Sequence, residues 1–287
     1  MTTGGTAREA GGAADGRTPG TRRRTALVTG ASSGIGRAVC EALLARGYHV
    51  LATSRSPEKI PEADRLPGAE YLPLDLTDPA SIEACAAAAG EVDVLVNNAG
   101  ESQLAPLEEL PMDALERLFQ LNVFGAVRLT QLLLPGMRER RHGRVVMVGS
   151  MLASFPLAFR SSYVASKAAV KAFATASRRE LSPYDVWLTT VEPGSINTGI
   201  SERRTRYLTD NSPYAEAFGT VSARLDRNEA TGISAATVAA TILKAIEAPR
   251  PKPLYAVGSN APLVFTLRRL ISRRRAESLV SRKHGLK

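Results

Sequence analysis

Cysteine, tryptophan and histidine are scarce in this chain, and their scarcity excludes several kinds of protein. Among 287 residues there are two cysteines, one tryptophan and three histidines. Cys40 and Cys85 lie in separate segments of helical character and lack the spacing of metal ligands. We therefore expect two buried, reduced thiols, with neither a disulfide framework nor a metal site. This use of cysteine predicts a cytoplasmic protein, because the cytoplasm is a reducing compartment.

Long hydrophobic runs are also absent. No apolar stretch approaches the roughly 18 residues that a membrane span needs. Residues 1–20 lack the apolar core of a signal peptide. Residues 1–23 contain no aromatic residue and are rich in glycine, alanine, threonine and arginine, which predicts a disordered basic tail.

The net charge of +9 is unevenly distributed along the chain. Residues 1–24 carry +3 and residues 250–287 carry +9, which leaves −3 on the residues between them. A nucleic-acid-binding enzyme is expected to carry its basic patch on the folded body. We therefore predict no nucleic-acid partner and assign the basicity to the two ends of the chain.

A glycine-rich turn follows the first predicted strand. Residues 25–29 are apolar enough for a buried strand, 30–36 have the spacing Gly-x-x-x-Gly-x-Gly, and 37–46 have helical periodicity. A second strand follows at 48–53, which completes a βαβ unit. A phosphate group would meet backbone N–H groups and a helix N-terminus at such a turn. A plain tight turn is the alternative, and the position between strand and helix favours the phosphate site.

Six or seven apolar strands alternate with helices along residues 24–258. This order predicts an α/β fold, a doubly wound parallel sheet (Rossmann fold) of about seven strands with helices on both faces. Residues 112–140 are expected to form one long helix that contains Asn122 and that Pro135 kinks or ends. The stretch of about 195–233 is too long for a simple loop, so we expect a substrate lid there, with short helices of its own.

The residues after the second strand indicate the cofactor. No acidic residue stands there to bind the adenosine ribose. Instead, Ser54 and Arg55 suit a 2′-phosphate, which favours NADP(H) over NAD(H), although a solvated arginine at a loop start is the alternative. Asp75 is placed to contact an adenine edge, and Asp78 is expected to cap the following helix. Asn98 follows another strand, where either a ligand contact or an asparagine turn would fit.

Tyr163 and Lys167 are four residues apart on a predicted helix, so they share one face. A lysine ammonium near a phenol stabilises the phenolate, which makes the tyrosine a usable acid and base. By itself this pair could arise by chance. Ser150 precedes it at the end of another strand, which supports a common site.

Taken together, the glycine-rich turn, Asn97-Asn98-Ala99-Gly100, Ser150 and Tyr163-Val164-Ala165-Ser166-Lys167 resemble the short-chain dehydrogenase/reductase family over about residues 24–257. The resemblance implies that Tyr163 is the general acid or base, that Lys167 assists it and binds the nicotinamide ribose, and that Ser150 polarises the substrate oxygen. Asn122 would hold a water that relays protons to Lys167. The cofactor would be bound by Tyr163, Lys167 and by Gly30, Ser32, Ser33, Gly34, Ile35, Gly36, Ser54, Arg55, Asp75, Leu76, Asn98, Ala99, Gly100, Pro193, Gly194, Ile196 and Thr198.

This resemblance predicts hydride transfer between NADP(H) and a small-molecule ketone or secondary alcohol in a homodimer or homotetramer. A catalytically silent dinucleotide sensor or scaffold, attached to a membrane surface through its C-terminus, is the alternative. Five residues suggest an apolar or partly aromatic substrate, although they could instead pack the lid against the body: Phe155, Leu157, Phe159, Tyr207 and Tyr214.

Residues 259–287 form a basic extension with amphipathic character. Leu263, Leu267, Leu270 and Ile271 recur at helical spacing among arginines. Three interpretations stay open: a helix in weak contact with an anionic membrane surface, a flap over the substrate mouth, and a solvated terminal helix.

Overall fold

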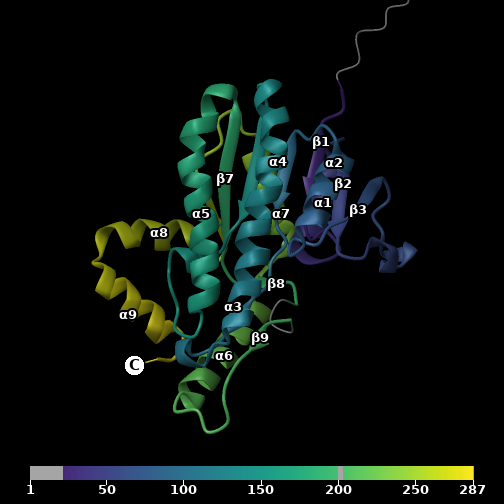
Figure 1. Ribbon diagram of the computed structural model, residues 1–287. Coiled ribbons are helices and arrows are strands. Elements are labelled where there is room, and N and C mark those ends of the chain that lie inside the picture. The colour runs from purple at the N-terminus through teal and green to yellow at the C-terminus, as the bar shows by residue number, and fades with distance from the viewer. Residues whose placement is uncertain (1–21, 200–202, 287) are drawn as a thin grey trace, which may run out of the picture.

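The computed structural model describes residues 22–199 and 203–286. A seven-stranded sheet forms its centre, and the strands lie in the order β11-β7-β6-β4-β1-β2-β3, each parallel to its neighbours. This arrangement confirms the predicted doubly wound sheet (Figure 1). The strands are β1 (Thr25–Val28), β2 (His49–Ser54), β3 (Ala69–Pro73), β4 (Val94–Asn97), β6 (Gly143–Val148), β7 (Val186–Pro193) and β11 (Leu254–Val257).

Helices cover both faces of this sheet because successive side chains of each strand point to opposite sides. On one face, Ala26 and Val28 pack with residues of α1 (Gly34–Ala45) and α7 (Ala235–Glu247). On the other face, Leu27 packs with residues of α2 (Pro79–Ala89), α4 (Gly125–Glu139) and α5 (Ser161–Leu181). The strands are therefore apolar on both sides, as a parallel sheet requires.

The two cysteines belong to these two cores. Cys40 is buried on α1 and Cys85 on α2, and both thiols are free, as predicted. Burial raises the pKa of the Cys40 thiol to about 12 and that of Cys85 to about 11. Both groups are thus held as neutral thiols, which are poor nucleophiles.

The predicted helix over 112–140 contains a widened turn. Regular helix runs over α3 (Met112–Phe119), a π-helical turn follows at Gln120–Phe124, and α4 continues from Gly125. Pro135 lies inside α4, which continues to Glu139, so the prediction that Pro135 could end the helix is wrong. The π turn contains Asn122, and single π turns of this kind occur frequently at functional sites.

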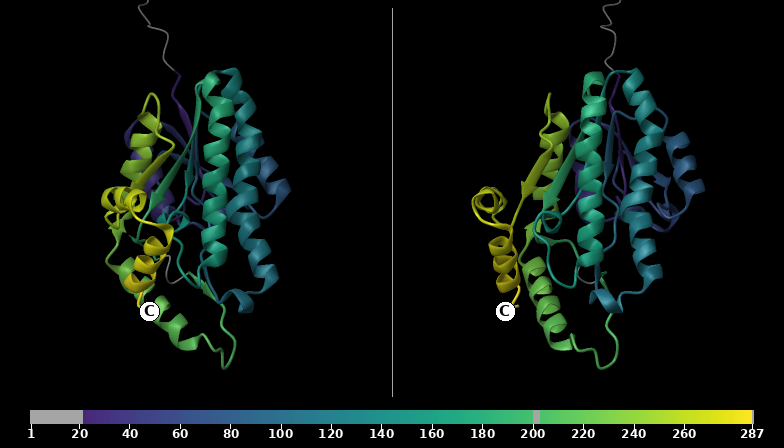
Figure 2. Two further views of the ribbon diagram at one scale, coloured as in Figure 1. Left: turned by 90° about the vertical axis from the view of Figure 1, so that its left-hand side faces the viewer. Right: turned by 60° about the vertical axis from the view of Figure 1, so that its left-hand side comes forward.

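The stretch after β7 has secondary structure of its own. It contains the short strands β8 (Ile196–Asn197), β9 (Thr205–Arg206) and β10 (Ile233–Ser234), and helix α6 (Ala215–Ala230). Strand β9 pairs with β5 (Gln103–Leu104), and β8 pairs with β10. These short elements extend beyond the carboxyl ends of the main strands, with α6 farthest from the sheet (Figure 2).

The C-terminal extension forms two helices instead of the single one that the leucine spacing suggested. They are α8 (Ala261–Leu270) and α9 (Arg273–Lys283), and Ser272 separates them because its side chain caps α9. The chain thereby returns to α6, beside which the C-terminus lies (Figure 2). None of the helices in the described ranges is both long enough and apolar enough to cross a membrane.

The N-terminal tail was predicted over residues 1–23, most of which lie outside the described residues. Its last two members belong to the folded body. Arg22 donates to the buried Asp93 at 2.6 Å, and Arg23 donates to the carbonyl oxygens of Gly47 and Tyr48 at 2.7 and 2.6 Å. Arg22 and Arg23 are therefore held against the folded body, and the rest of the predicted tail lies outside the described residues.

Candidate active site

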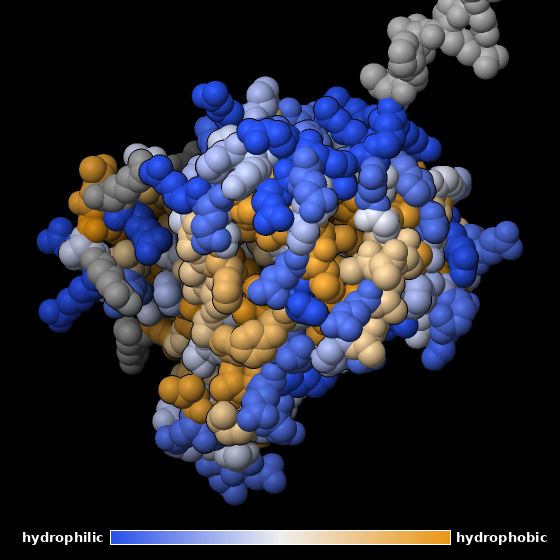
Figure 3. All heavy atoms as spheres, turned by 45° about the horizontal axis from the view of Figure 1, so that its top comes forward, coloured by the Kyte–Doolittle hydropathy of each residue, from blue (hydrophilic) through white to orange (hydrophobic). Residues whose placement is uncertain are grey.

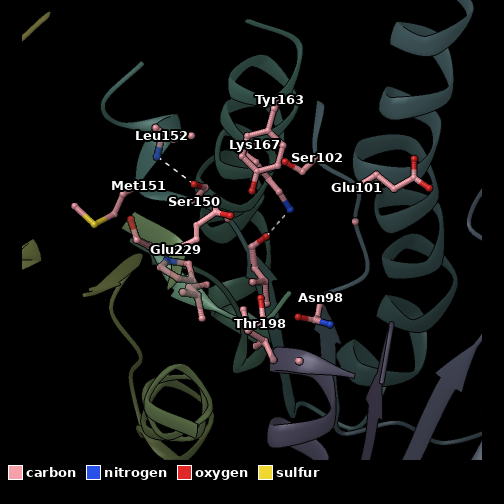
Figure 4. Close-up of a pocket in the computed structure, with 18 of the residues that line it drawn as sticks. Asn98, Glu101, Ser102, Ser150, Met151, Leu152, Tyr163, Lys167, Thr198 and Glu229 are labelled. Carbon is pink, nitrogen blue, oxygen red and sulfur yellow. Dashed lines mark hydrogen bonds between the residues drawn. The ribbon is translucent and has the colours of Figure 1, made fainter. Parts of the chain in front are cut away.

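A cavity of about 860 Å³ lies at the carboxyl ends of the central strands. Every residue that the sequence assigned to the site lines it, apart from Gly36 and Asn122. Figure 4 shows Ser150, Tyr163 and Lys167 around one space with Asn98 and Thr198. Parallel strands bring their ends to one edge of the sheet, which explains why sequence segments so far apart meet here.

The glycine-rich turn is shaped by close backbone contacts. Gly30 has a φ of +65°, which favours glycine, and a Cβ there would lie 3.0 Å from Ala99 Cα. A Cβ on Gly36 would overlap the Gly30 carbonyl oxygen and lie 2.6 Å from Asn98 Nδ2. Gly36 does not line the cavity; instead it lets α1 approach Gly30 and the side chain of Asn98 closely.

Asn98 joins the ends of β1 and β4. Its side-chain Nδ2 donates to the carbonyl oxygens of Thr29 and Gly30 at 2.9 and 3.2 Å. The Thr29 hydroxyl in turn accepts from the backbone N–H groups of Asn98 and Ala99. Asn98 lines the cavity, but these bonds show that it also holds the glycine-rich turn in position.

Two features of the first half of the cavity suit a dinucleotide. Ser33, the residue before α1, makes no capping hydrogen bond with its side chain, so the first N–H groups of α1 stay available to an anion. At the end of β2, the buried hydroxyls of Thr53 and Ser54 have no hydrogen-bond partner among the described residues. The exposed Arg55 lines the cavity next to them.

Asp75 and Asp78 follow β3. The Asp75 carboxylate accepts from the Thr77 backbone N–H at 2.8 Å and from the Thr77 hydroxyl at 2.6 Å. The hydrogen bond from the Thr77 hydroxyl is the main cause that lowers the pKa of Asp75, so its carboxylate is ionised at neutral pH. Asp78 caps α2 through the Ala80 N–H, as predicted, and Asp75 is the one that lines the cavity.

Tyr163, Lys167 and Ser150 form the reactive end of the cavity. Tyr163 is 7% exposed, and the Lys167 ammonium nitrogen lies 5.8 Å from the centroid of its ring. Lys167 Nζ donates to the Val148 carbonyl oxygen at 3.0 Å, which fixes it at the end of β6 (Figure 4). The Ser150 oxygen accepts from the Leu152 N–H at 3.2 Å, so its own hydroxyl proton remains available to a ligand.

Asn122 lies next to this end without lining the cavity. Its Oδ1 accepts from the Glu101 N–H at 2.8 Å, while its Nδ2 donates to the Glu101 carbonyl oxygen and to Ser166 Oγ. A Cβ on Gly100 would lie 3.0 Å from Asn122 Oδ1 and 3.3 Å from Lys167 Nζ. The Asn122 side chain therefore connects the chain after β4 to the helix that carries Tyr163.

Close contacts at Gly194 position the segment that follows β7. The Gly194 N–H donates to the Val257 carbonyl oxygen at 2.8 Å, and a Cβ on Gly194 would overlap Ser259 Oγ. Pro193, Gly194, Ile196 and Thr198 all line the cavity beside the glycine-rich turn. This segment is thus held against β11 while it faces the turn.

The aromatic residues predicted near a substrate divide into two groups. Phe155 lines the cavity. By contrast, Phe159 packs edge-on against Tyr214 and Phe218, at centroid distances of 6.2 and 5.8 Å, and Leu157 belongs to the same apolar cluster. Neither these residues nor Tyr207 line the cavity. For Leu157, Phe159 and Tyr214 the alternative holds, because they pack the stretch around α6 against the body.

Several lining residues were missed at the sequence level. One set comes from the charged positions Glu101, Arg117, Arg160, Arg203 and Glu229; a second set comes from the C-terminal helices and comprises Val264, Leu267, Leu279, Val280, Lys283 and His284. Arg160 could have been found, since it precedes Tyr163 by one helical turn. Of the second set only Leu267 was named, and its place at the cavity agrees with the flap among the three interpretations of residues 259–287. The other members have no local signal, because they reach the cavity only through tertiary packing.

A parallel sheet with a glycine-rich turn at its first strand, and a tyrosine–lysine pair at the opposite wall, defines a dinucleotide-dependent oxidoreductase. Comparison with known proteins specifies the family. The sequence model described as short chain dehydrogenase matches residues 24–208. The chain belongs to the short-chain dehydrogenase/reductase family and is an NAD(P)-dependent oxidoreductase.

Individual relatives support this assignment. Dehydrogenase/reductase SDR family member 7B of Mus musculus is 34% identical over 238 residues, 78% of this chain and 71% of the mouse protein. NADPH-dependent 3-dehydrocapnine reductase of Ornithobacterium rhinotracheale is 32% identical over 248 residues, 82% of this chain and 88% of that protein. The crystal structure of a short-chain dehydrogenase from Streptomyces avermitilis has a TM-score of 0.76 and 36% identity, and covers 91% of this chain and 97% of that one.

Proposed function

We propose that this protein transfers a hydride between NADP(H) and a ketone or secondary alcohol, with Tyr163 as the general acid and base. The observation that carries the proposal is that Ser150, Tyr163 and Lys167 line the same cavity as the glycine-rich turn. A catalytically silent sensor would need the turn, but nothing in a binding role requires the buried tyrosine–lysine pair.

A nicotinamide cofactor held by the glycine-rich turn, Tyr163 and Lys167 would supply the hydride for the carbonyl carbon in the direction of reduction. The Tyr163 hydroxyl donates a proton to the carbonyl oxygen as negative charge develops on it. Ser150 donates a hydrogen bond to the same oxygen and so orients the carbonyl. The Lys167 ammonium stabilises the phenolate that Tyr163 becomes when it has given up this proton. In oxidation the phenolate takes the hydroxyl proton of the alcohol.

Asn122 takes the role of a positioning residue in this proposal. Its three side-chain hydrogen bonds hold the Glu101 backbone and Ser166 together. A water held at the π turn would relay a proton towards Lys167, as the family resemblance implies. The side chain keeps that turn in register with α5.

NADP(H) is the proposed cofactor because Ser54 and Arg55, at the end of β2, suit a 2′-phosphate. A 2′-phosphate would accept hydrogen bonds from the Ser54 hydroxyl and from Arg55. The relative from Ornithobacterium rhinotracheale, which is named for its NADPH dependence, supports this preference. The remaining predicted contacts, from Gly30 to Thr198, would hold the rest of the dinucleotide.

A homo-oligomer is proposed through the face of α4 and α5. Phe124 in the π turn is 54% exposed and Phe173 on α5 is 44% exposed. Figure 3 shows hydrophobic residues gathered on this side of the molecule. Burying such residues against a second copy would remove them from water. Sedimentation analysis tests this: a dimer or tetramer is expected, and a monomer at micromolar concentration would contradict it.

Substitution of Tyr163 by Phe tests the proposed reaction. We expect NADPH-dependent reduction of a panel of aldehydes and ketones, and a loss of about 10²- to 10⁴-fold in kcat for Tyr163→Phe. NADPH binding, followed by fluorescence titration, should stay close to that of the unaltered protein. Tyr184→Phe is a matched control, because Tyr184 is an exposed tyrosine at the end of α5. Equal turnover by the Tyr163→Phe protein would overturn the assignment.

A further inference from the structure

The cavity continues from Tyr163 into a space covered by the C-terminal extension. Helix α8 is fixed by Phe265, whose ring packs edge-on against Phe155 at 5.1 Å. Helix α9 is fixed at its end, where the Lys283 carbonyl oxygen accepts from Arg224 Nε at 3.1 Å and Leu286 packs against the cluster around Leu225. The two helices therefore form a wall held at both ends.

Most of the side chains with which this wall faces the cavity are apolar, and Lys283 and His284 line the cavity where α9 ends. Val264 and Leu267 of α8 and Leu279 and Val280 of α9 line it, and Met151, Leu152 and Phe155 line the cavity from the body. Leu267 is 43% exposed and Leu279 is 50% exposed, so the structure alone does not bury them. A hydrocarbon chain between these side chains would remove apolar surface from water.

A buried charged cluster lies at the tyrosine end of the same space. Arg160 donates to Ser102 Oγ at 2.9 Å and to the Gln103 carbonyl oxygen at 2.8 Å. Arg204, whose side chain is fully buried, pairs with Asp226 at 2.9 Å and with Glu229. Arg160 and Glu229 both line the cavity, and Figure 4 shows Glu229 on the side away from Glu101 and Asn98.

Two atoms of this cluster lack partners among the described residues. They are Nε of Arg160, which is 3% exposed, and Oε2 of Glu229, whose side chain is 13% exposed. One is a donor and the other an acceptor, and an unpaired buried polar atom is unfavourable. A ligand that brings an acceptor to the Arg160 atom and a donor to the Glu229 atom would satisfy them. The Arg160 guanidinium also contacts the Tyr163 ring, which places that group near the reacting carbonyl.

We propose that the substrate is an amphiphilic ketone. Its polar head carries a hydroxyl or ammonium group that donates to Glu229 Oε2 and an oxygen that accepts from Arg160 Nε. Its hydrocarbon chain lies between α8, α9 and the segment with Phe155. This inference rests on the proposed ketone reduction and specifies the substrate class for it.

Three ketones of equal chain length test the head group: a 2-alkanone, the 1-hydroxy-2-alkanone and the 1-amino-2-alkanone. We expect kcat/KM to be at least about 10-fold higher for one or both substituted ketones than for the plain ketone. Glu229→Gln should lower kcat/KM for the substituted ketones by a larger factor than for the plain ketone, and so remove most of that preference. Glu216→Gln, at an exposed position of the same helix, should leave all three unaffected. The hydroxy and amino compounds distinguish the two possible donors.

Chain length tests the apolar wall. Across a series of plain 2-alkanones, kcat/KM should rise with each added methylene and the rise should be smaller in Leu267→Asn. Leu263→Asn is the matched control, because Leu263 lies one turn earlier on α8, is 69% exposed and does not line the cavity. Thermal melting measures whether each variant is folded. If Glu229→Gln does not fold, Glu229→Asp serves as the second variant that tests the head group.

The outcomes separate the two proposals. NADPH-dependent reduction of plain ketones with no preference for a head group, or equal losses on all three ketones in Glu229→Gln, would overturn the amphiphilic substrate and leave the ketone reductase standing. A kcat/KM that does not change with chain length would contradict the proposal that the hydrocarbon chain binds against α8 and α9. Failure of every ketone to oxidise NADPH would overturn the reductase itself.

Discussion

The guanidinium carbon of Arg160 lies 4.2 Å from the centroid of the Tyr163 ring. Arg160 is the residue before α5, and Tyr163 stands in the first turn of that helix. Burial lowers the pKa of Arg160 to about 10, so the guanidinium is still protonated at neutral pH. A buried cation over the face of the phenol holds the ring by electrostatic attraction to its π system. Arg160 thus positions the residue that is proposed to transfer the proton.

Replacing Arg160 should slow every carbonyl substrate. Loss of a desolvated cation–π contact worth about 2 kcal/mol predicts a decrease of about 30-fold in kcat for Arg160→Leu. Arg160→Lys should recover part of this rate, because it restores the charge but not both hydrogen bonds. NADPH affinity should be retained. Arg179→Leu, at an exposed position of α5, is the control. Full kcat in folded Arg160→Leu would show that the contact has no role in turnover.

Arg55 should determine the choice of cofactor. A charge-assisted hydrogen bond to the 2′-phosphate contributes about 1.5–3 kcal/mol, so Arg55→Ala should raise the Kd for NADPH by about 10- to 100-fold. NADH lacks this phosphate, so its Kd should hardly change. Isothermal titration with both cofactors measures the difference. Lys59→Ala, an exposed lysine that does not line the cavity, is the control. Equal weakening of both cofactors would contradict the proposed NADP(H) preference.

Gly36 and Gly219 should respond oppositely to alanine. A Cβ on Gly36 overlaps Gly30 and approaches Asn98 Nδ2, whereas a Cβ on Gly219 of α6 meets nothing within 4 Å. We expect Gly36→Ala to lower the free energy of unfolding by about 2 kcal/mol or more and to weaken NADPH binding. Gly219→Ala should raise it by about 0.5–1 kcal/mol, because alanine is the better helix former. Urea unfolding measures both, and similar effects of the two substitutions would contradict the close approach at Gly36.

Acidification should weaken the attachment of the C-terminus. His284 is buried, with Nδ1 2.9 Å from the Val280 carbonyl oxygen, and burial lowers its pKa below the ordinary 6.5. The unfolded chain therefore takes up a proton more readily than the folded one, so stability is complete above about pH 6.5 and decreases as the pH falls below it. The lowered pKa values of Asp75, Glu109 and Asp185 act at lower pH.

The measurement is the free energy of unfolding between about pH 7 and pH 5. His284→Asn should reduce its slope in this range. Burial also lowers the pKa of His142, which lies at the other end of the sheet. His142→Asn should therefore also reduce the slope of the free energy of unfolding against pH, and it serves as a comparison. Hydrogen exchange in α9 should increase with acid in the unaltered protein and less so in His284→Asn. An unchanged slope in His284→Asn would exclude this histidine as a source of acid sensitivity.

The wall opposite the sheet shows why the sequence could not predict the whole site. Leu267 was predicted to belong to an amphipathic extension, with a flap over the substrate mouth as one interpretation, and Leu279 was not named. The position of both residues over the cavity depends on contacts of α8 and α9 with Phe155, Arg224 and the α6 cluster. These contacts join residues that are between about 55 and 110 positions apart in the sequence, and no periodicity records them. The same reason explains why two alternatives stayed open for Leu157 and Phe159, whose apolar character fits a substrate pocket and a packed cluster equally well.

By itself, the sequence determined the doubly wound sheet, the turn at Gly30–Gly36 and the order of Ser150, Tyr163 and Lys167. These follow from local rules, because strand periodicity, glycine spacing and one helical turn need only neighbouring residues. Tertiary structure decided which side chains surround them. Arg160 over Tyr163, the unpaired Oε2 of Glu229 and the C-terminal wall all depend on contacts between separate segments. Their positions depend on the packing of the folded chain, which local patterns do not encode.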